Sequence, residues 1–209
     1  MTYLSMQGSA DPRARSSYPF LRVPERRANT SLRFEREQVI CLPTDAPQVF
    51  KIVSGWVRLV QDLADGRRQI VSFHGKGDYV WCMRSPSAAI YAEALEDTLL
   101  ICSDGVSKEE MYQAALQQLA DSQKHVLLLS QRSSDERVAS FLLDMQRRLG
   151  STRIFSLPMS RADFAAFVGM KIETISRCLS SLQQRGLIRL HGLRGIEIPT
   201  RAALERLLQ

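Results

Sequence analysis

One segment constrains this chain more than any other, because its spacing predicts two short helices joined by a tight turn. The segment is MSRADFAAFVGMKIETISRCLSSLQQRG, residues 159–186. Ser160 can cap the first helix, and Asp163, three residues later, suits the positive end of the same helix. Gly169 can take the left-handed conformation that ends this helix, so a second helix is predicted from about Lys171.

Small and apolar side chains recur where these two helices would cross. Ala165, four residues before Gly169, allows the two backbones to approach closely. The side chains expected to fill the crossing are Phe164, Val168, Ile175 and Cys178. The arrangement is a helix-turn-helix, whose second helix enters the major groove of DNA with its N-terminal residues at the base edges.

Polar residues on the second helix carry groups that match base edges. Arginine can donate two hydrogen bonds to guanine, glutamate can accept one from cytosine, and serine suits several bases. We therefore predict base reading by Glu173, Ser176 and Arg177. The alternative is that Glu173 and Arg177 only form a surface pair four residues apart, which is common on helices.

A hairpin is predicted after the second helix. Two short apolar runs, residues 187–190 and 196–198, flank turn residues 191–195. The whole is then a winged helix-turn-helix, in which Arg189 and Arg194 contact DNA phosphates and position the protein without reading the base sequence. We also expect Ser160, Lys171 and Thr174 to contact the DNA backbone.

Three stretches of the chain resemble one known family. Residues 157–188 resemble the DNA-binding domain of the CRP/FNR superfamily, in particular its FNR and FixK branches, whose recognition helix carries an E-x-x-S-R pattern. Here this pattern is Glu173, Ser176 and Arg177. Residues 49–78 are similar to the β-roll of the family's effector domain, and residues 133–145 to the segment after its dimerisation helix. The resemblance covers roughly residues 35–200.

The resemblance implies an α+β fold with a cyclic-nucleotide-binding-like antiparallel β-roll at residues 35–106. A dimerisation helix at residues 107–134 and a winged helix-turn-helix at residues 135–209 would follow it, and a mobile basic arm at residues 1–34 would precede it. By the same resemblance, we expect a homodimer that binds a palindromic, TTGAT-like site on double-stranded DNA. It would regulate low-oxygen or nitrogen-related genes, mainly as an activator that contacts RNA polymerase.

The residues themselves also predict the roll. Asp65-Gly66 is a strong hairpin-turn signal between runs of β-branched and aromatic residues. Short, regularly spaced strands of this kind favour an antiparallel roll or barrel. The predicted strands are residues 49–53, 56–60, 70–73 and 98–102.

A long helix is predicted over residues 107–133, with Ser107 as its cap. An approximately heptad apolar seam predicts that this helix pairs with a second copy, whereas Leu127 and Leu128 are expected to pack on the chain's own roll. Residues 135–149 form a further predicted helix. The seam residues are Tyr112, Leu116, Leu119 and Val126, and the apolar face of the further helix is Val138, Phe141, Leu142 and Met145.

The formal net charge of +6 is unevenly distributed along the chain. Residues 159–209 carry +4 and residues 1–40 carry +3, whereas the remainder carries −1. Attraction of phosphate is the natural use of the first excess. The N-terminal arm, rich in proline, serine and arginine, either contacts DNA or stays solvated, and we expect the solvated state.

We expect neither a cofactor nor binding of cyclic AMP. Where the cyclic-nucleotide-binding members carry Gly-Glu and Arg-Ser pairs, this chain has about Trp81-Cys82 and Ala88-Ala89, which offer no partner for a phosphate. The FNR branch holds its iron-sulfur cluster through N-terminal cysteines, and none precedes Cys41.

A haem site is also not favoured. Cys82-Met83-Arg84 loosely resembles the loop of the haem-binding carbon monoxide sensor, but Arg84 replaces its histidine, and His74 has the character of a structural residue. A ligand- or haem-dependent gas or redox sensor remains the alternative function.

Other classes find little support. The four cysteines are scattered, so neither a disulfide framework nor a zinc site is indicated, and Cys178 is expected to be a buried hydrophobe rather than a redox switch. No paired nucleophile and base or phosphate loop supports an enzyme. Without a membrane-length apolar run or a signal-peptide core, we expect a cytoplasmic protein that does not bind membranes.

Overall fold

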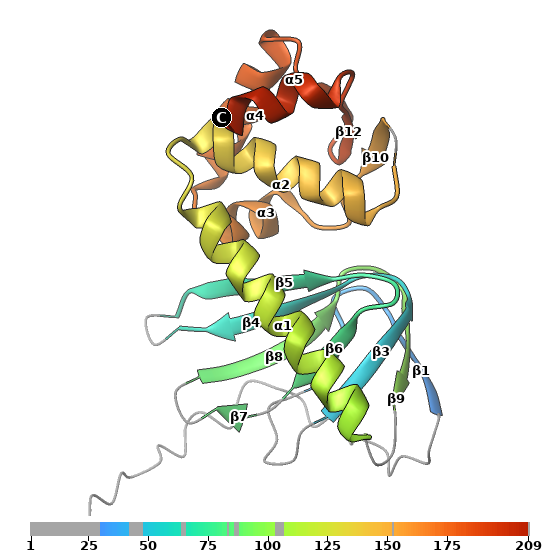
Figure 1. The fold of residues 1–209 in the computed structure, drawn as a ribbon. Coiled ribbons are helices and arrows are strands. Elements are labelled where there is room, and N and C mark those ends of the chain that lie inside the picture. The colour runs from blue at the N-terminus through green and yellow to red at the C-terminus, as the bar shows by residue number, and fades with distance from the viewer. Residues whose placement is uncertain are drawn as a thin grey trace, which may run out of the picture.

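The structure, a computed structural model, places a β-roll below a helical C-terminal part, with one long helix running from one to the other (Figure 1). It describes residues 30–41, 48–63, 66–82, 84–85, 88–102, 107–151 and 153–208.

The described part of the roll consists of two antiparallel sheets. One sheet has the strand order β1-β9-β3-β6, and the other has the order β2-β8-β4-β5 with β7 paired to β8. Side chains from both sheets meet in a core that includes Phe50, Ile52, Val57, Leu59 and Leu100. The predicted antiparallel roll is confirmed. The strands are β1 Thr30–Phe34, β2 Val39–Cys41, β3 Gln48–Ser54, β4 Val57–Asp62, β5 Arg68–His74, β6 Tyr79–Cys82, β7 Arg84–Ser85, β8 Ala88–Ala94 and β9 Thr98–Cys102.

The roll begins earlier than predicted. The sequence places residues 1–34 in a mobile arm, but residues 30–34 form β1, which pairs with β9 along its whole length. The reason is a short alternation of apolar and polar residues, in which Leu32 and Phe34 point to the same side and pack against the roll core. The rest of the predicted arm, residues 1–29, lies outside the described residues.

The predicted hairpin joins β4 and β5. These strands are paired from Val57 opposite His74 to Asp62 opposite Arg68. Gly66 in the connection has φ +81°, a left-handed conformation that glycine adopts without steric cost. Asp65, the other predicted turn residue, lies outside the described residues.

Helix α1, Lys108–Leu129, is shorter than predicted. Its N-terminus has the expected cap, since Ser107 and Glu110 form a capping box. It ends four residues before residue 133, because the Ser130 hydroxyl bonds to the Leu127 carbonyl oxygen and Ser133 already caps the next helix. Leu128 is buried as expected, but the prediction for Leu127 was wrong: adjacent helical residues point about 100° apart, and Leu127 is 65% exposed.

The C-terminal part is a small helical domain with one three-stranded sheet. The strand order is β10-β12-β11, and the antiparallel strands β11 and β12 form the predicted hairpin. All four side chains predicted for the apolar face of α2 are buried. The elements are α2 Ser134–Arg148, β10 Ile154–Ser156, α3 Arg161–Phe167, α4 Ile172–Gln184, β11 Arg189–His191, β12 Gly195–Glu197, α5 Arg201–Glu205 and the 3₁₀ helix η2 Arg206–Leu208.

Candidate nucleic-acid interface

Helices α3 and α4 form the predicted pair around a tight turn. The Ser160 hydroxyl accepts a hydrogen bond from the Asp163 backbone N–H at 3.0 Å, and the Asp163 carboxylate accepts one from the Ser160 N–H at 3.3 Å. This capping box fixes the start of α3. Gly169 has φ +67°, the left-handed conformation expected at the turn, and Lys171 is the N-cap residue of α4.

The crossing of the two helices is filled as predicted. Phe164, Val168 and Ile175 are fully buried, and Cys178 and Ala165 nearly so. With this face of α4 covered, the opposite face remains in solvent. The helix is therefore held by its apolar side and presents a polar side to a partner.

All three predicted base-reading residues lie on that exposed face. Glu173, Ser176 and Arg177 are exposed, and the Ser176 hydroxyl donates to the carbonyl oxygen of Ile172 at 3.0 Å. Both residues of the alternative surface pair are described, and the structure records no ion pair between Glu173 and Arg177.

The polar face continues beyond the predicted residues. A shallow hollow on α4 is lined by Ser176, Arg177, Ser180, Ser181 and Gln184. Ser180 and Gln184 were not predicted, although their spacing carries the signal: Ser180 follows Ser176 by four residues and Arg177 by three, and Gln184 follows Ser180 by four.

On the hairpin, one carboxylate organises three basic side chains. Glu197 is buried and accepts hydrogen bonds from Arg153 at 2.8 Å, Arg189 at 3.1 Å and His191 at 3.0 Å. These partners, His191 first, hold the pKa of Glu197 below its usual value, so the carboxylate is charged. Arg153 was not predicted, since it lies 44 residues away in the chain.

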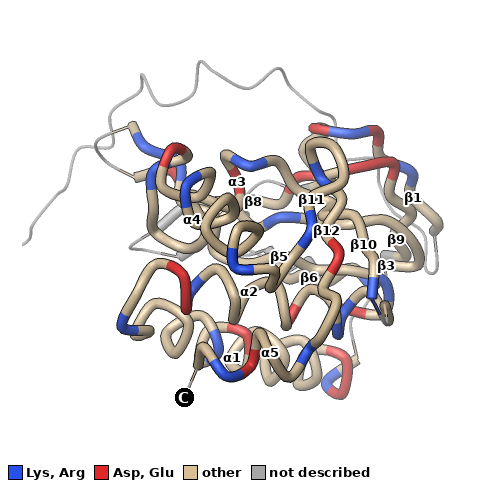
Figure 2. The backbone as a smooth tube through the Cα atoms, turned by 90° about the horizontal axis from the view of Figure 1, so that it is seen from above, with Lys and Arg blue, Asp and Glu red and all other residues tan. Residues whose placement is uncertain are grey.

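The remaining residues predicted to contact phosphates lie at the start of α4 and on the hairpin. Arg194 donates to the Pro158 carbonyl oxygen at 3.1 Å, and Lys171 and Thr174 lie at the N-terminal end of α4. Seen from above, basic positions flank α3, α4 and β11 (Figure 2). Lys171 and Thr174 thus lie at the start of α4, whereas Arg189 and Arg194 lie on the hairpin.

The predicted dimerisation seam is exposed along α1. Tyr112 is 58% exposed, Leu116 43%, Leu119 56% and Val126 66%, whereas Ala114 and Leu128 on the opposite side are buried in the chain's own fold. Leu127, which was predicted to pack on the roll, is exposed and adds to the apolar surface of α1.

Cys178 has the environment of an inert thiol. Burial raises its pKa to about 11, Asp135 adds to this effect, and the opposing influence of Arg177 is smaller. These observations support the buried interpretation. The side chains of Cys41, Cys82 and Cys102 lie outside the described part of the structure.

The roll provides few groups for a cofactor within the described residues. No cluster of three or more His, Cys, Asp or Glu side chains there is placed to hold a metal ion. His74 is buried, bonds to the Ser72 hydroxyl at 2.7 Å, and has a pKa lowered by burial to about 4, so it is neutral. Of the helices in the described ranges, none has both the length and the apolar character of a membrane span.

Comparison with known proteins agrees with this geometry. A Crp-like helix-turn-helix domain model matches residues 136–207, and a cyclic nucleotide-binding domain model matches residues 31–114. The nitrogen fixation regulation protein FixK of Rhizobium meliloti is 36% identical over 162 residues, 76% of this chain and 77% of the relative. FixK of Azorhizobium caulinodans is 35% identical over 185 residues, which cover 78% of this chain and 72% of the relative. The solved structure of FixK2 from Bradyrhizobium japonicum has a TM-score of 0.74 and 32% identity, covering 87% of this chain and 98% of that chain.

Proposed function

Because the chain belongs to the CRP/FNR superfamily of transcription regulators, in its FixK-like branch, we propose that its homodimer binds a palindromic, TTGAT-like DNA site. The protein is a DNA-binding transcription regulator and not an enzyme. The observation that carries the proposal is the polar stripe of Glu173, Ser176 and Arg177, held in solvent by the buried crossing of α3 and α4.

The chemistry of the stripe matches the proposed site. Arg177 can donate two hydrogen bonds to the guanine of TTGAT, and Glu173 can accept from the amino group of the cytosine paired with a guanine. Ser176 keeps a hydroxyl oxygen that can accept while its proton bonds to Ile172. These three side chains would supply the sequence preference.

Contacts to phosphates would supply most of the remaining affinity. We assign them to the N-cap residue of α3, the start of α4 and the hairpin: Ser160, Lys171, Thr174, Arg189 and Arg194. Arg189 already pairs with Glu197, and that pair holds its guanidinium in one place on the hairpin.

The dimer would form through the exposed seam of α1. We propose residues 107–134 as the dimerisation segment and residues 135–209 as the DNA-binding domain, with residues 35–106 as the body of the roll. Two-fold symmetry then places the two α4 helices at half-sites about one DNA turn apart.

The regulated genes would be nitrogen-related or low-oxygen genes, and activation would act through RNA polymerase in the cytoplasm. The FixK relatives are named for the regulation of nitrogen fixation, which supports this assignment. We further propose that DNA binding needs no small-molecule effector, because the residues that hold cyclic nucleotides or clusters in the family are replaced here.

One observation favours a second candidate, a ligand-dependent regulator. A cavity of about 320 Å³ lies between the roll and the helices, with Phe73, Lys124, His125, Phe141, Arg148 and Phe167 among its lining residues. That volume is at the lower end of the range for small-molecule sites.

One binding experiment tests the proposed function and separates the two candidates. The purified protein is titrated, without additive, against a TTGAT palindrome and against a scrambled duplex at the same salt concentration. We expect a preference of at least about a thousandfold for the palindrome. Equal affinity for both duplexes would contradict the base-reading assignment, and binding only after a metabolite is added would favour the second candidate.

A further inference from the structure

A buried arginine of the roll holds the start of the helix-turn-helix. Arg58 lies on β4, and its side chain is only 5% exposed. Its Nη1 donates to both carboxylate oxygens of Asp163 in α3, each at 2.9 Å. The two residues are 105 positions apart in the chain and belong to different domains.

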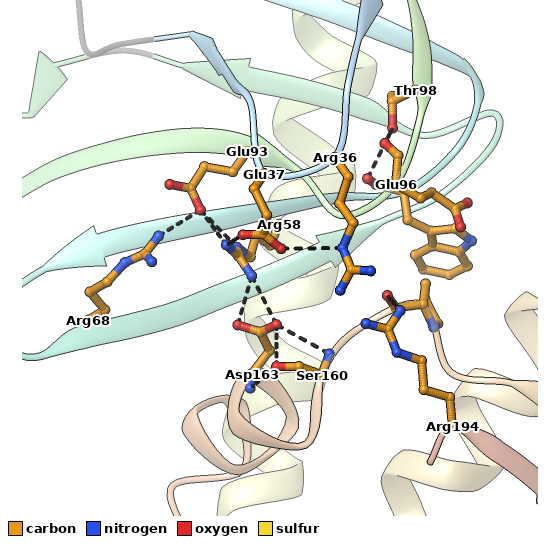
Figure 3. Close-up of polar contacts among 12 residues, drawn as sticks. Arg36, Glu37, Arg58, Arg68, Glu93, Glu96, Thr98, Ser160, Asp163 and Arg194 are labelled. Atoms are coloured by element: carbon orange, nitrogen blue, oxygen red, sulfur yellow. Dashed lines mark hydrogen bonds and ion pairs between the residues drawn. The ribbon is translucent and has the colours of Figure 1, made fainter. Parts of the chain in front are cut away.

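The alternation of side chains along β4 explains why the Arg58 side chain points out of the roll core. Val57 and Leu59, on either side of Arg58, point into the core between the two sheets. Successive side chains of a strand point to opposite faces, so Arg58 points outward, toward the C-terminal domain. Figure 3 shows its guanidinium between the carboxylates of the roll and Asp163 below them.

Two further carboxylates fix the guanidinium from the roll side. Its Nε donates to Glu93 on β8 at 2.8 Å, and its Nη2 bonds to Glu37, in the turn before β2. Glu93 also accepts from Arg68 at 2.6 Å. Burial alone would lower the pKa of Arg58, but Asp163, Glu93 and Glu37 raise it above its usual value, so the side chain is charged.

Asp163 has two tasks at once. Its carboxylate accepts bonds from the N–H and hydroxyl of Ser160, which fixes the first turn of α3, and both of its oxygens accept from Nη1 of Arg58. A displacement of Arg58 would therefore reach α3 directly, and then α4 through the packed crossing of the two helices.

The other contacts across this joint are both polar and apolar. The Gln69 amide donates to the Ala166 carbonyl oxygen at 3.0 Å, and Arg148 donates to the Asp78 carboxylate at 2.8 Å. Phe73 of β5 packs against the rings of Phe141 and Phe167, and apolar packing of this kind tolerates small rotations. The Arg58 guanidinium differs from these contacts, because its Nε, Nη1 and Nη2 atoms each bond to a different carboxylate, and this permits far less rotation. A buried ion pair adds little net stability compared with apolar packing, so geometry is its more natural contribution.

We propose that Arg58 is a positioning residue for DNA binding, which sets the orientation of the helix-turn-helix on the roll through its contact with Asp163. This inference rests on the proposed function. The roll is joined to the α1 dimer helix, so the Arg58–Asp163 contact determines the separation and angle of the two recognition helices in a dimer. Its specific consequence is a preference for one spacing between half-sites.

The test measures affinity for a series of TTGAT palindromes whose half-site spacing changes one base pair at a time. Arg58→Met removes the charge and its hydrogen bonds, and Asp163→Asn weakens the same contact while keeping a side-chain oxygen that can accept from the Ser160 N–H in the capping box of α3. Arg33→Met is the matched control, because it removes one positive charge from an exposed position on β1 of the same roll. Thermal melting is recorded for each variant.

We expect the wild type and Arg33→Met to prefer one spacing strongly. In Arg58→Met and Asp163→Asn, the ratio of affinities between the best site and one longer by a base pair should fall about tenfold, or ~1.4 kcal/mol. In the double variant this ratio should be no smaller than in the more affected single variant, because both changes break the same contact. A lower melting temperature alone would not produce this altered spacing profile.

A wild-type spacing profile in either folded variant, or failure of both variants to fold, would overturn the proposal in favour of a purely structural ion pair. The proposed function has a separate readout. Its failure would appear as wild-type protein that binds no palindrome of the series.

Discussion

His125 of α1 stacks on Phe167 of α3, with ring centroids 4.1 Å apart and ring planes inclined by 7°. The Nε2 atom of His125 also lies 2.7 Å from the carbonyl oxygen of Phe167. Phe167 in turn contacts Phe73 of the roll. One residue at the end of the first helix of the helix-turn-helix thus touches both the proposed dimer helix and the roll.

This contact predicts a stability effect. His125→Ala removes the stacked ring and the hydrogen bond at the Phe167 carbonyl, and should lower the free energy of unfolding by about 1–3 kcal/mol. The neighbouring Lys124→Ala removes an exposed ion pair with Asp121 and should change it by less than about 1 kcal/mol. Urea unfolding of the two variants measures the difference, and equal effects would show that the stack contributes nothing specific.

A second prediction separates base reading from phosphate contact. Arg177→Ala should cost about 1–3 kcal/mol per half-site on the specific palindrome and relax the preference for guanine there. Arg189→Ala should weaken binding to all sequences alike and reduce the salt dependence by about one unit of slope. Titrations on specific and random duplexes at several salt concentrations provide both quantities. An equal loss on specific and random DNA for Arg177→Ala would refute its role.

The sequence predicted those features that depend on local spacing. Ser160, Asp163 and Gly169 define α3 and the turn within ten residues, and the structure has the expected cap and left-handed glycine. Strand runs and the Gly66 turn likewise predicted the β4–β5 hairpin. Local patterns succeed here because caps, turns and alternation act between neighbours in the chain.

Contacts between distant parts of the chain were not predictable in this way. Arg58 lies in the stretch that resembles the family's β-roll, but nothing in the neighbouring sequence identifies Asp163 as its partner, because the pairing depends on how the domains pack. The Arg153–Glu197 pair and the place of β1 beside β9 have the same origin. Leu127 was wrongly predicted to pack on the roll with Leu128, because the side chains of two consecutive helical residues point about 100° apart and only Leu128 faces the roll.

The exposed seam of α1 gives a third prediction. Leu119→Glu would place two like charges face to face in an apolar contact, which is unfavourable by several kcal/mol unless the carboxylates reach water or become protonated. The dimer should dissociate, and affinity for the palindrome should fall with it. Gln118→Glu adds the same charge about a quarter turn from the seam and is the control. If the Leu119→Glu variant still sediments as a dimer and binds the palindrome, the dimer contact lies elsewhere.

A fourth prediction concerns the thiol in the helix crossing. With a pKa near 11, about one thousandth of Cys178 is thiolate at pH 8, so peroxide and alkylating reagents should react with it slowly. Cys178→Val should therefore keep the DNA affinity of the wild type, and any effect of peroxide on that affinity should be the same in both proteins. A variant that has lost a peroxide response present in the wild type would identify Cys178 as a redox switch.

The last prediction concerns control of the protein. A ligand regulates such a protein only by binding its active conformation better than its inactive one, so a roll without groups to hold a ligand cannot supply that difference in free energy. In this chain Ala88 and Ala89 stand about where the cyclic-nucleotide-binding members have their Arg-Ser pair, and Arg84 replaces the haem-binding histidine.

The joint between the domains is also closed by contacts that require no ligand, among them Arg58 with Asp163 and His125 with Phe167. We therefore expect the aerobically purified, colourless protein to bind its palindrome, and cyclic AMP to shift neither its affinity nor its melting temperature. Control would then depend on the amount of protein, or on covalent change at another cysteine such as Cys82, whose side chain is outside the described residues. The same titrations after addition of haem, or after reconstitution of an iron-sulfur cluster, provide the comparison. A protein that binds DNA only after one of these additions would show that the roll is a true sensor and that the cavity beside His125 and Phe167 is the first place to look for its ligand.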